Sequence, residues 1–450
     1  MEKTVTDYLD TDYGNYAKYV IENRAIPSVI DGFKPTQRKI IHIASKVWKN
    51  KGSDKPLKIF QLAGKVASDA NYHHGDASLS SAIVSMAQSF KNSMPLLDEI
   101  GQFGSLRSPD AGAPRYISTR INDNFKLLYK DFELLQKRYE EGIEIEPNYF
   151  LPIIPTVLLN GGSGIAVGFA SNILNRNPLD LVNACVKELE NKRYSEPKPW
   201  YRGFTGHCER DSNNKDTWIF SGSFIVNNTS TVTIGELPPS LTYEKYEKYL
   251  VGIEDSKKIT TFDDNSSSNI NYVIKFKRAD LSKLIDTGRL IKFLKLEERQ
   301  SENLTMLDEN GKLKIFDNVK DVISYFVNFR LAFYDKRKGY LINKLELELI
   351  TLSNKAKFIK HIIDGKLKIN NIAKRIIIDY LEKHTFEKVE SSYNYLLSMP
   401  IHSLTKEKYE EILSLEKEKN NELVMVNKLK PINMYMSDLN DLKKMIKKIN

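Results

Sequence analysis

The spacing of hydrophobic residues divides the chain into three regions. In the first, residues 1–150, apolar residues recur at helical spacing after Pro35 and again after Asp76, and both residue types are favoured in the first turn of a helix. Lys58, Lys65 and a pair of histidines lie between the two helices. This arrangement predicts a helix-turn-helix core.

The second region, residues 151–320, has the pattern of short β-strands separated by polar turns. The predicted strands are Ile153–Leu159, Trp218–Val226, Thr231–Ile234 and Tyr272–Phe276. The alternation of these runs with polar turns predicts an α/β or β-rich second domain.

The third region is strongly helical. Two long stretches, residues 321–352 and 405–428, carry a narrow apolar stripe, so we expect an antiparallel coiled-coil arm. Residues 353–404 hold enough apolar side chains for a small helical tip, and the apolar surface of this tip is expected to meet a second copy of the chain. Residues 429–450 form a C-terminal segment. The predicted fold class is therefore multidomain α+β.

Composition narrows the class of protein. The 450 residues include 67 Lys and Arg against 58 Asp and Glu, and the resulting net charge of +9 is compatible with a polyanionic partner but does not require one. The two cysteines, Cys185 and Cys208, are too few for a disulfide framework or a four-ligand zinc site. No stretch approaches the roughly 20 apolar residues of a membrane span, and the N-terminus lacks the apolar core of a signal peptide. We therefore expect a cytoplasmic protein that does not associate with membranes.

The pair Arg115-Tyr116 carries the most chemical information. A phenol has a pKa of about 10, which makes it a poor nucleophile at neutral pH but a comparatively good leaving group, and so favours a reversible phosphotyrosine bond over hydrolysis. A neighbouring guanidinium can bind the negative charge that develops on phosphate oxygens during such an attack. Because the chain contains 23 Tyr, an Arg-Tyr pair also occurs by chance. The interpretation therefore depends on the segments around it.

Several such segments occur together in a defined order. They are Arg24-Ala-Ile-Pro-Ser-Val-Ile-Asp-Gly32-Phe-Lys34-Pro35-Thr-Gln-Arg38-Lys39, Tyr72-His-His-Gly-Asp76, Gly101-Gln-Phe-Gly-Ser105, Arg115-Tyr116 and Leu158-Leu-Asn-Gly-Gly-Ser-Gly-Ile165-Ala-Val-Gly168. In this combination they resemble the DNA-cleavage subunit of type IIA DNA topoisomerases. Within that family the chain is most similar to the separate medium subunit of T4-like bacteriophages. It contains neither a recognisable ATPase module nor a metal-binding TOPRIM domain, and it ends too soon after the arm for a gyrase-type DNA-wrapping domain.

The resemblance implies a fold and a nucleophile. Residues 1–150 would form a winged-helix DNA-cleavage domain with an N-terminal arm, residues 151–320 a tower domain, and residues 353–404 the dimerisation tip, or C-gate. Tyr116 would attack the DNA backbone and become joined to a 5′ phosphate on each strand. Arg115 would stabilise the phosphate in the transition state.

The resemblance also implies further DNA contacts. The residues expected at the scissile phosphate are Arg38 and His74, and those expected at flanking phosphates are Lys39, Lys58 and Lys65. Ile165 matches an apolar wedge that enters between base steps and bends the duplex.

The implied partners are double-stranded DNA, a second copy of the chain and a further protein that carries TOPRIM and ATPase modules. The dimer would form through the tip and the winged-helix region. Mg²⁺ would be held by the partner's TOPRIM domain and ATP by the same partner, with no metal in this chain. Relaxation or decatenation is expected in preference to supercoiling, in the host cytoplasm if the protein is phage-encoded.

Three other interpretations fit the residues less well. A non-catalytic, architectural DNA-binding dimer of the same fold would be expected to have lost the Arg115-Tyr116 pair. A tyrosine recombinase would carry its nucleophile near the C-terminus, whereas Tyr116 lies in the first third of the chain. The glycine run Gly161–Gly168 lacks the Gly-x-Gly-x-x-Gly spacing of a nucleotide-binding turn.

The sequence departs from the family pattern in two places. In the loop before the tyrosine, Asp98-Glu-Ile-Gly-Gln-Phe-Gly104 replaces the commoner Asp-Gly-Gln-Gly-Asn-Phe-Gly. Ala77 and Ser81 stand where bacterial gyrases usually carry the serine and the acid that anchor quinolones. We therefore predict weak quinolone poisoning.

Overall fold

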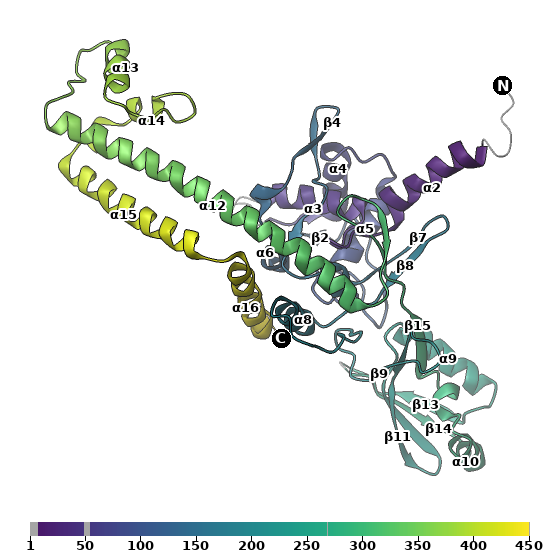
Figure 1. The fold of residues 1–450 in the computed structure, drawn as a ribbon. Helices are drawn as coiled ribbons and strands as arrows, with labels where there is room; N and C mark the ends of the chain where they lie inside the picture. The colour runs from purple at the N-terminus through teal and green to yellow at the C-terminus, as the bar shows by residue number, and fades with distance from the viewer. Residues whose placement is uncertain (1–7, 49–54, 268, 450) are drawn as a thin grey trace. The chain divides into compact units, whose positions relative to one another are not determined.

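The computed structural model describes residues 8–48, 55–267 and 269–449. The chain divides into two compact units. Unit 1 contains Met1–Arg330 and Asp438–Asn450, and unit 2 contains Leu331–Ser437. The mixture of helices and small sheets in Figure 1 agrees with the predicted multidomain α+β class.

Unit 1 begins with helices. The chain forms η1 (Leu9–Tyr13), α2 (Gly14–Val20), η2 (Ile21–Ala25), α3 (Pro35–Val47), α4 (Ile59–Asp69) and α5 (Asp76–Ala87). Of these, α3, α4 and α5 pack against one another. The helices predicted after Pro35 and Asp76 are confirmed by α3 and α5.

Helix α4 was missed by the sequence analysis. It starts where the Gln61 side chain accepts a hydrogen bond from the backbone N–H of Lys58 at 3.1 Å, which satisfies a donor at the helix start. Its inner face is apolar, with Ile59, Leu62 and Val66 fully buried. Lys65 therefore lies on a helix and not in a turn.

Short elements follow the first helices. They are β1 (Leu57–Lys58), β2 (Ser118–Thr119), α6 (Asp123–Leu128), β3 (Tyr129–Lys130), η3 (Phe132–Leu134), β4 (Arg138–Glu140), β5 (Ile143–Ile145), β6 (Leu151–Pro152), α7 (Thr156–Asn160), β7 (Gly162–Ile165), β8 (Ala170–Ile173) and α8 (Pro178–Leu189). β1 pairs antiparallel with β2, so Leu57 lies opposite Thr119 and Lys58 opposite Ser118. This pairing joins the start of α4 to the segment that directly follows Tyr116.

The strand predicted at Ile153–Leu159 is wrong. Residues 156–160 form α7, and the N–H of Leu158 donates to the carbonyl of Pro155 at 3.0 Å. Val157, Leu158 and Leu159 are all fully buried. A continuous apolar run of this kind has no readable period, so spacing alone does not separate a buried strand from a buried helix.

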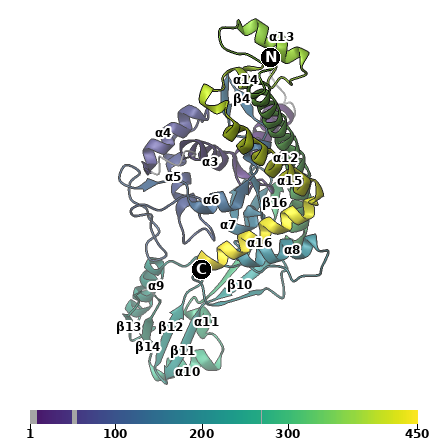
Figure 2. The same ribbon diagram turned by 90° about the vertical axis from the view of Figure 1, so that its left-hand side faces the viewer.

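The β-rich part of unit 1 contains two larger sheets. The first has the order β15-β10-β9 and the second β11-β12-β14-β13, and helices lie beside the second sheet in Figure 2. The elements are β9 (His207–Arg210), β10 (Thr217–Ser221), β11 (Ser223–Asn228), β12 (Thr231–Glu236), α9 (Tyr243–Asp255), β13 (Thr261–Asp264), β14 (Tyr272–Lys275), α10 (Arg278–Asp286), α11 (Leu290–Phe293), β15 (Glu297–Ser301), β16 (Thr305–Leu307) and β17 (Leu313–Ile315).

Three predicted strand regions fall on these strands. The run predicted at Trp218–Val226 is divided between β10 and β11 at Gly222, where a Cβ atom would meet the carbonyl oxygen of Glu236 at 2.2 Å. Buried aliphatic and aromatic side chains from the second sheet and from α9 form one hydrophobic core.

Unit 2 is helical. Its elements are the larger part of α12 (Val319–Ile363), then α13 (Lys374–Lys383), α14 (Asn394–Leu397), η4 (Ile401–Ser403), α15 (Lys406–Lys428) and the start of α16 (Pro431–Ile449). Lys338 Nζ donates to the carbonyl of Asn427 at 2.9 Å, and Lys419 pairs with Glu348 at 3.2 Å. As residue numbers rise along α12, the numbers of their contacts on α15 fall, so the two helices run antiparallel.

Candidate active site

Tyr116 presents its side chain to solvent from a well-fixed backbone. The side chain is 72% exposed, whereas the next residue, Ile117, is 3% exposed. The N–H of Tyr116 donates to the carbonyl of Ala113 at 2.9 Å, and the carbonyl of Ile117 accepts from the N–H of Ile59 at 3.1 Å. The phenol is therefore accessible while the chain that carries it is anchored to the start of α4.

Two cationic side chains contact Tyr116, one at its ring and one at its backbone. The guanidinium carbon of Arg115 is 5.6 Å from the centre of the Tyr116 ring. Lys58 Nζ donates to the carbonyl oxygen of Tyr116 at 2.7 Å. The Arg115 guanidinium is near enough to the ring to attract a phosphate that approaches the phenol, and Lys58 adds a positive charge at the backbone of the same residue. Of the residues predicted to act with Tyr116, the described contacts thus bring together Arg115 and Lys58.

The loop before the tyrosine is held at both ends. Near its start, Ile100 and Ser118 exchange backbone hydrogen bonds of 3.1 and 2.9 Å, and the N–H of Gly112 donates to the carbonyl of Gln102 at 2.8 Å. Gly104 has a φ of +83°, and a Cβ atom there would lie 2.5 Å from the carbonyl oxygen of Pro109. Only glycine fits this turn, because any larger residue would clash with the backbone.

A second group of predicted residues lines a groove of about 840 Å³ in unit 1. His74, Arg38 and Lys39 all contribute to its wall. His74 is exposed, its Nε2 lies 3.3 Å from the hydroxyl of Tyr19, and its ring packs edge-on against Tyr72 with centres 5.3 Å apart. Tyr116 is not among the residues that line this groove.

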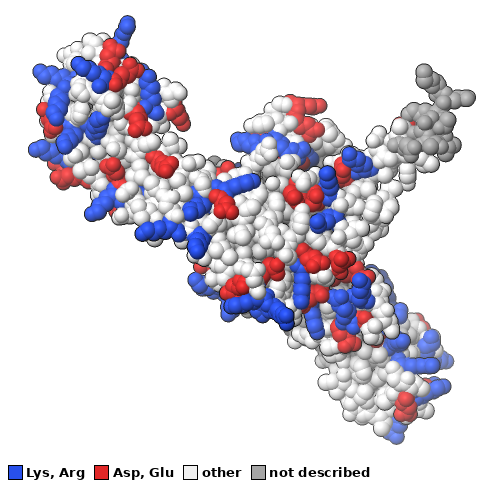
Figure 3. All heavy atoms as spheres, in the orientation of Figure 1, with Lys and Arg blue, Asp and Glu red and all other residues white. Residues whose placement is uncertain are grey.

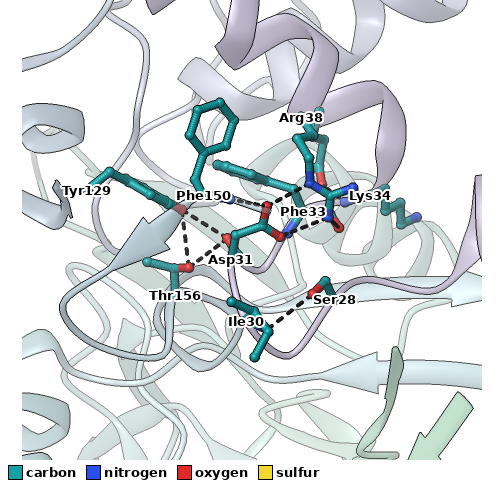
Figure 4. A network of polar contacts seen from close by, with 10 residues as sticks. Ser28, Ile30, Asp31, Phe33, Lys34, Arg38, Tyr129, Phe150 and Thr156 are labelled. Carbon is teal, nitrogen blue, oxygen red and sulfur yellow. Dashed lines mark hydrogen bonds and ion pairs between the residues drawn. The ribbon is translucent and has the colours of Figure 1, made fainter. Parts of the chain in front are cut away.

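Arg38 is committed to a buried ion pair (Figure 4). Its Nε donates to Asp31 Oδ2 at 2.7 Å, and its Nη2 donates to Asp31 Oδ1 at 3.0 Å and to the carbonyl of Phe33 at 3.2 Å. Arg38 is 8% exposed and Asp31 is fully buried. Burial disfavours the guanidinium charge, but the Asp31 carboxylate more than compensates, so the pKa of Arg38 is raised. The predicted contact between Arg38 and a phosphate competes with this pairing.

Asp31 ties Arg38 to distant parts of the domain. Its carboxylate accepts the N–H of Phe150 at 3.1 Å. Its backbone carbonyl accepts hydrogen bonds from the hydroxyls of Tyr129, at 3.0 Å, and Thr156, at 2.7 Å. Four segments of the chain therefore meet at one aspartate, which the sequence analysis did not single out.

The remaining predicted lysines differ in their surroundings. Lys39 Nζ pairs with Glu146 at 2.9 Å and donates to the carbonyl of Ala70 at 2.6 Å, so its charge is partly neutralised within the domain. Lys65 lies on the exposed face of α4. Lys65 is therefore more accessible from solvent than Lys39.

Ile165 lies at the end of a hairpin. β7 and β8 pair antiparallel with Ile165 opposite Ala170, and Ile165 is 88% exposed. Lys34 Nζ donates to the carbonyl of Ser163 at 2.7 Å, and a Cβ atom at Gly164 would lie 2.0 Å from the carbonyl oxygen of Ala25. β7 thus packs closely against the start of the domain, while the side chain of Ile165 faces solvent.

The same hairpin accounts for the glycine run Gly161–Gly168. The run enters a strand, β7, and is followed by a second strand, β8, and not by a helix. It therefore lacks the helix N-terminus with which glycine-rich loops bind nucleotide phosphates.

Lys34 and Asp31 are the residues at this site that sequence reasoning undervalued. Both lie in the segment that also contains Arg38. The position of Asp31, seven residues before Arg38, was the feature of the sequence that could have indicated an ion pair. In the described parts of the chain, no group of three or more His, Cys, Asp and Glu side chains is arranged to hold a metal ion. No helix in those parts is long and apolar enough to cross a membrane.

Fold and site together define a member of a known family. The family profile for the A subunit of DNA gyrase/topoisomerase IV matches residues 24–442, and the chain belongs to this family. It is 33% identical over 408 residues to the DNA topoisomerase medium subunit of Enterobacteria phage T4, and the match covers 90% of each chain.

Eukaryotic proteins are also similar. DNA topoisomerase 2 of Arabidopsis thaliana is 32% identical over 478 residues, which cover 95% of this chain but 32% of that protein. The chain thus spans about a third of the length of this relative. Its structure superimposes on the DNA-binding, cleavage and re-ligation domain of Plasmodium falciparum topoisomerase II with a TM-score of 0.88 and 33% identity, covering 98% of this chain and 64% of that chain.

Proposed function

We propose that this chain is the DNA-cleavage and religation subunit of a type II DNA topoisomerase. The observation that carries the proposal is the exposed phenol of Tyr116, which lies on an anchored backbone beside Arg115 and Lys58. The family membership supports it.

The proposed reaction is a reversible exchange of phosphate esters. Tyr116 Oη attacks a backbone phosphorus, the bond from phosphorus to the 3′ oxygen breaks, and the phenolic proton is replaced by the 5′-phosphoryl group. The 3′ oxygen leaves as a hydroxyl and later attacks the phosphotyrosine to restore the strand. Because one phosphate ester replaces another, no ester bond is lost to water. Arg115 is proposed to stabilise the extra negative charge on the phosphate, since its guanidinium lies 5.6 Å from the centre of the ring.

The other predicted residues receive roles that fit their surroundings. His74 is proposed to contact DNA from the groove, and Lys58 and Lys65 to hold flanking phosphates. For Arg38 and Lys39 we propose positioning roles, because their charges pair with Asp31 and Glu146.

Ile165 is proposed as the wedge that bends the duplex, because an apolar side chain so exposed gains by insertion between bases. Surface charge is a weaker guide to the DNA path, since acidic and basic side chains are intermixed on the face shown in Figure 3.

The domains are proposed to follow the family plan. α3, α4 and α5 with the β1–β2 pair would form the winged-helix domain, and residues 151–320 the tower. α12 and α15 would form the coiled-coil arm. Residues 353–404 would form the dimerisation tip. The phage T4 relative is named as a medium subunit, which supports a partner that supplies TOPRIM and ATPase modules with their Mg²⁺ and ATP. The assembled enzyme would relax or decatenate double-stranded DNA in the cytoplasm of a host cell.

Cleavage of supercoiled plasmid tests the proposal. Wild-type protein and Tyr116→Phe are each mixed with the TOPRIM-bearing protein from the same genome, Mg²⁺ and a detergent quench. Linear DNA with protein on its 5′ ends is expected for the wild type and not for the variant. If both proteins bind DNA equally and neither cleaves while the partner hydrolyses ATP, the chain is an architectural DNA-binding protein.

A further inference from the structure

Helix α5 is linked to the nucleophile through the loop that precedes Tyr116. The two residues that directly follow α5 make the link. Gln88, which is 2% exposed, donates from Nε2 to the carbonyl of Phe103 at 2.7 Å. Ser89 donates its N–H to Glu99 Oε1 at 3.0 Å and its hydroxyl to Glu99 Oε2 at 2.9 Å. Glu99 thus uses both carboxylate oxygens on a single residue.

The segment that Glu99 belongs to also holds the strand after Tyr116. The N–H of Asp98 donates to the carbonyl of Arg120 at 2.9 Å, and Arg120 Nε returns a hydrogen bond to Asp98 Oδ2 at 2.6 Å. Ile100 exchanges two backbone hydrogen bonds with Ser118, two residues beyond Tyr116. Residues 98–100 therefore form a bridge, with α5 on one side and the tyrosine strand on the other.

The Glu99 side chain makes the contact that ties this bridge to the residues following α5. Backbone hydrogen bonds such as those of Ile100 form with any residue, whereas the Ser89 contact needs a side chain with an acceptor oxygen at position 99. Glycine, which occupies this place in the commoner family pattern, has no side chain for it. Because Glu99 itself is exposed, the contact contributes little to global stability. Its effect is expected on local geometry.

We propose that Glu99 is a positioning residue that couples α5 to Tyr116. The inference rests on the proposed function, in which Tyr116 is the nucleophile. α5 presents small side chains to solvent, among them Ala77, Ser78 and Ser81, so a duplex can approach its surface closely. When DNA lies against α5, the Ser89–Glu99 contact fixes the loop and with it the direction of the phenol. Displacing the nucleophile by a fraction of an ångström lowers the rate of cleavage, while the affinity of the protein for DNA is unchanged.

The test is single-turnover cleavage of an end-labelled duplex by the enzyme reconstituted with its TOPRIM-bearing partner. DNA binding is measured on the same proteins by fluorescence anisotropy. For Glu99→Ala we expect a cleavage rate constant about tenfold below wild type at saturating DNA, which corresponds to about 1.4 kcal/mol. The Kd for DNA should stay within about twofold, because no proposed DNA contact is removed.

Three variants separate positioning from charge and from folding. Glu99→Gln keeps an acceptor oxygen for Ser89 and is expected to restore most of the rate. Glu133→Ala removes another exposed carboxylate from the same unit and should cleave like the wild type. If Glu99→Ala fails to fold, Ser89→Ala removes only the hydroxyl and should slow cleavage about threefold.

The outcomes are distinct. If the wild type cleaves and Glu99→Ala cleaves with the same rate constant, the proposed role of Glu99 is overturned while the proposed function stands. Equal losses in Glu99→Ala and Glu99→Gln, matched by weaker DNA binding, would overturn it as well. If the wild type itself does not cleave with an active partner, the proposed function fails and the role of Glu99 fails with it.

Discussion

Replacing Asp31 by Asn should strongly destabilise unit 1. The substitution leaves the guanidinium of Arg38 without its counter-charge in a site where Arg38 is 8% exposed and Asp31 is fully buried. The carboxylate accepts two hydrogen bonds from Arg38, at 2.7 and 3.0 Å, and one each from the N–H groups of Phe33 and Phe150, both at 3.1 Å. An amide can accept on only one of its two ends, so its NH₂ group must face at least one of these donors.

The expected magnitude follows from the loss of one partner of a buried pair, which costs about 3–5 kcal/mol because a charge is left uncompensated. The assay is urea unfolding at pH 7, followed by circular dichroism, with the free energy extrapolated to water. Asp123→Asn is the matched control. Its carboxylate is 92% exposed and lies 3.6 Å from Lys126, so the same chemical change should cost less than about 0.5 kcal/mol.

Equal stabilities of Asp31→Asn and Asp123→Asn would contradict a stabilising role for the Asp31–Arg38 pair. Arg38 would then not need its partner, and the guanidinium would be available to bind phosphate as the sequence first indicated. A loss of stability in Asp31→Asn, with cleavage retained at low temperature where the variant is folded, would support a positioning role for Arg38.

Three further predictions concern other parts of unit 1. Burial, aided by the charge of Lys46, lowers the pKa of His42 to about 4; since the unfolded chain binds this proton near pH 6.5, stability should fall as the pH drops from 6.5 towards 4, by about 2 kcal/mol. The unfolding free energy of His42→Gln should depend less on pH over this range, and an identical dependence would contradict the assignment. Ile165→Ser should change stability by less than about 0.5 kcal/mol, because the side chain is 88% exposed. The same variant should reduce the bend of a bound duplex measured by energy transfer, and an unchanged bend would exclude Ile165 as the wedge. With Ala77 and Ser81 on α5, ciprofloxacin should stimulate cleavage only weakly, and potent stimulation in the plasmid assay would overturn that prediction.

Part of the fold was predictable because the signals were local. The apolar spacing after Pro35 and Asp76 indicated α3 and α5, since a helix places residues three and four apart on one face. Strands such as β12 and β14 followed from alternation between polar turns. α4 and α7 were missed, because one lay in a segment treated as a connection and the other in an apolar run without a period.

For the candidate site, the sequence by itself singled out Tyr116, Arg115 and Ile165. These residues were identified from the order of short motifs along the chain, and identifying them in this way needs no information about tertiary contacts. The tertiary structure alone decided which charges are available. Arg38 was expected at a phosphate but is paired with Asp31, whose partners include Phe150 far along the chain. Burial and ion pairing depend on contacts between segments that are far apart in the sequence. A pattern of residues along the chain does not show which of these segments come into contact.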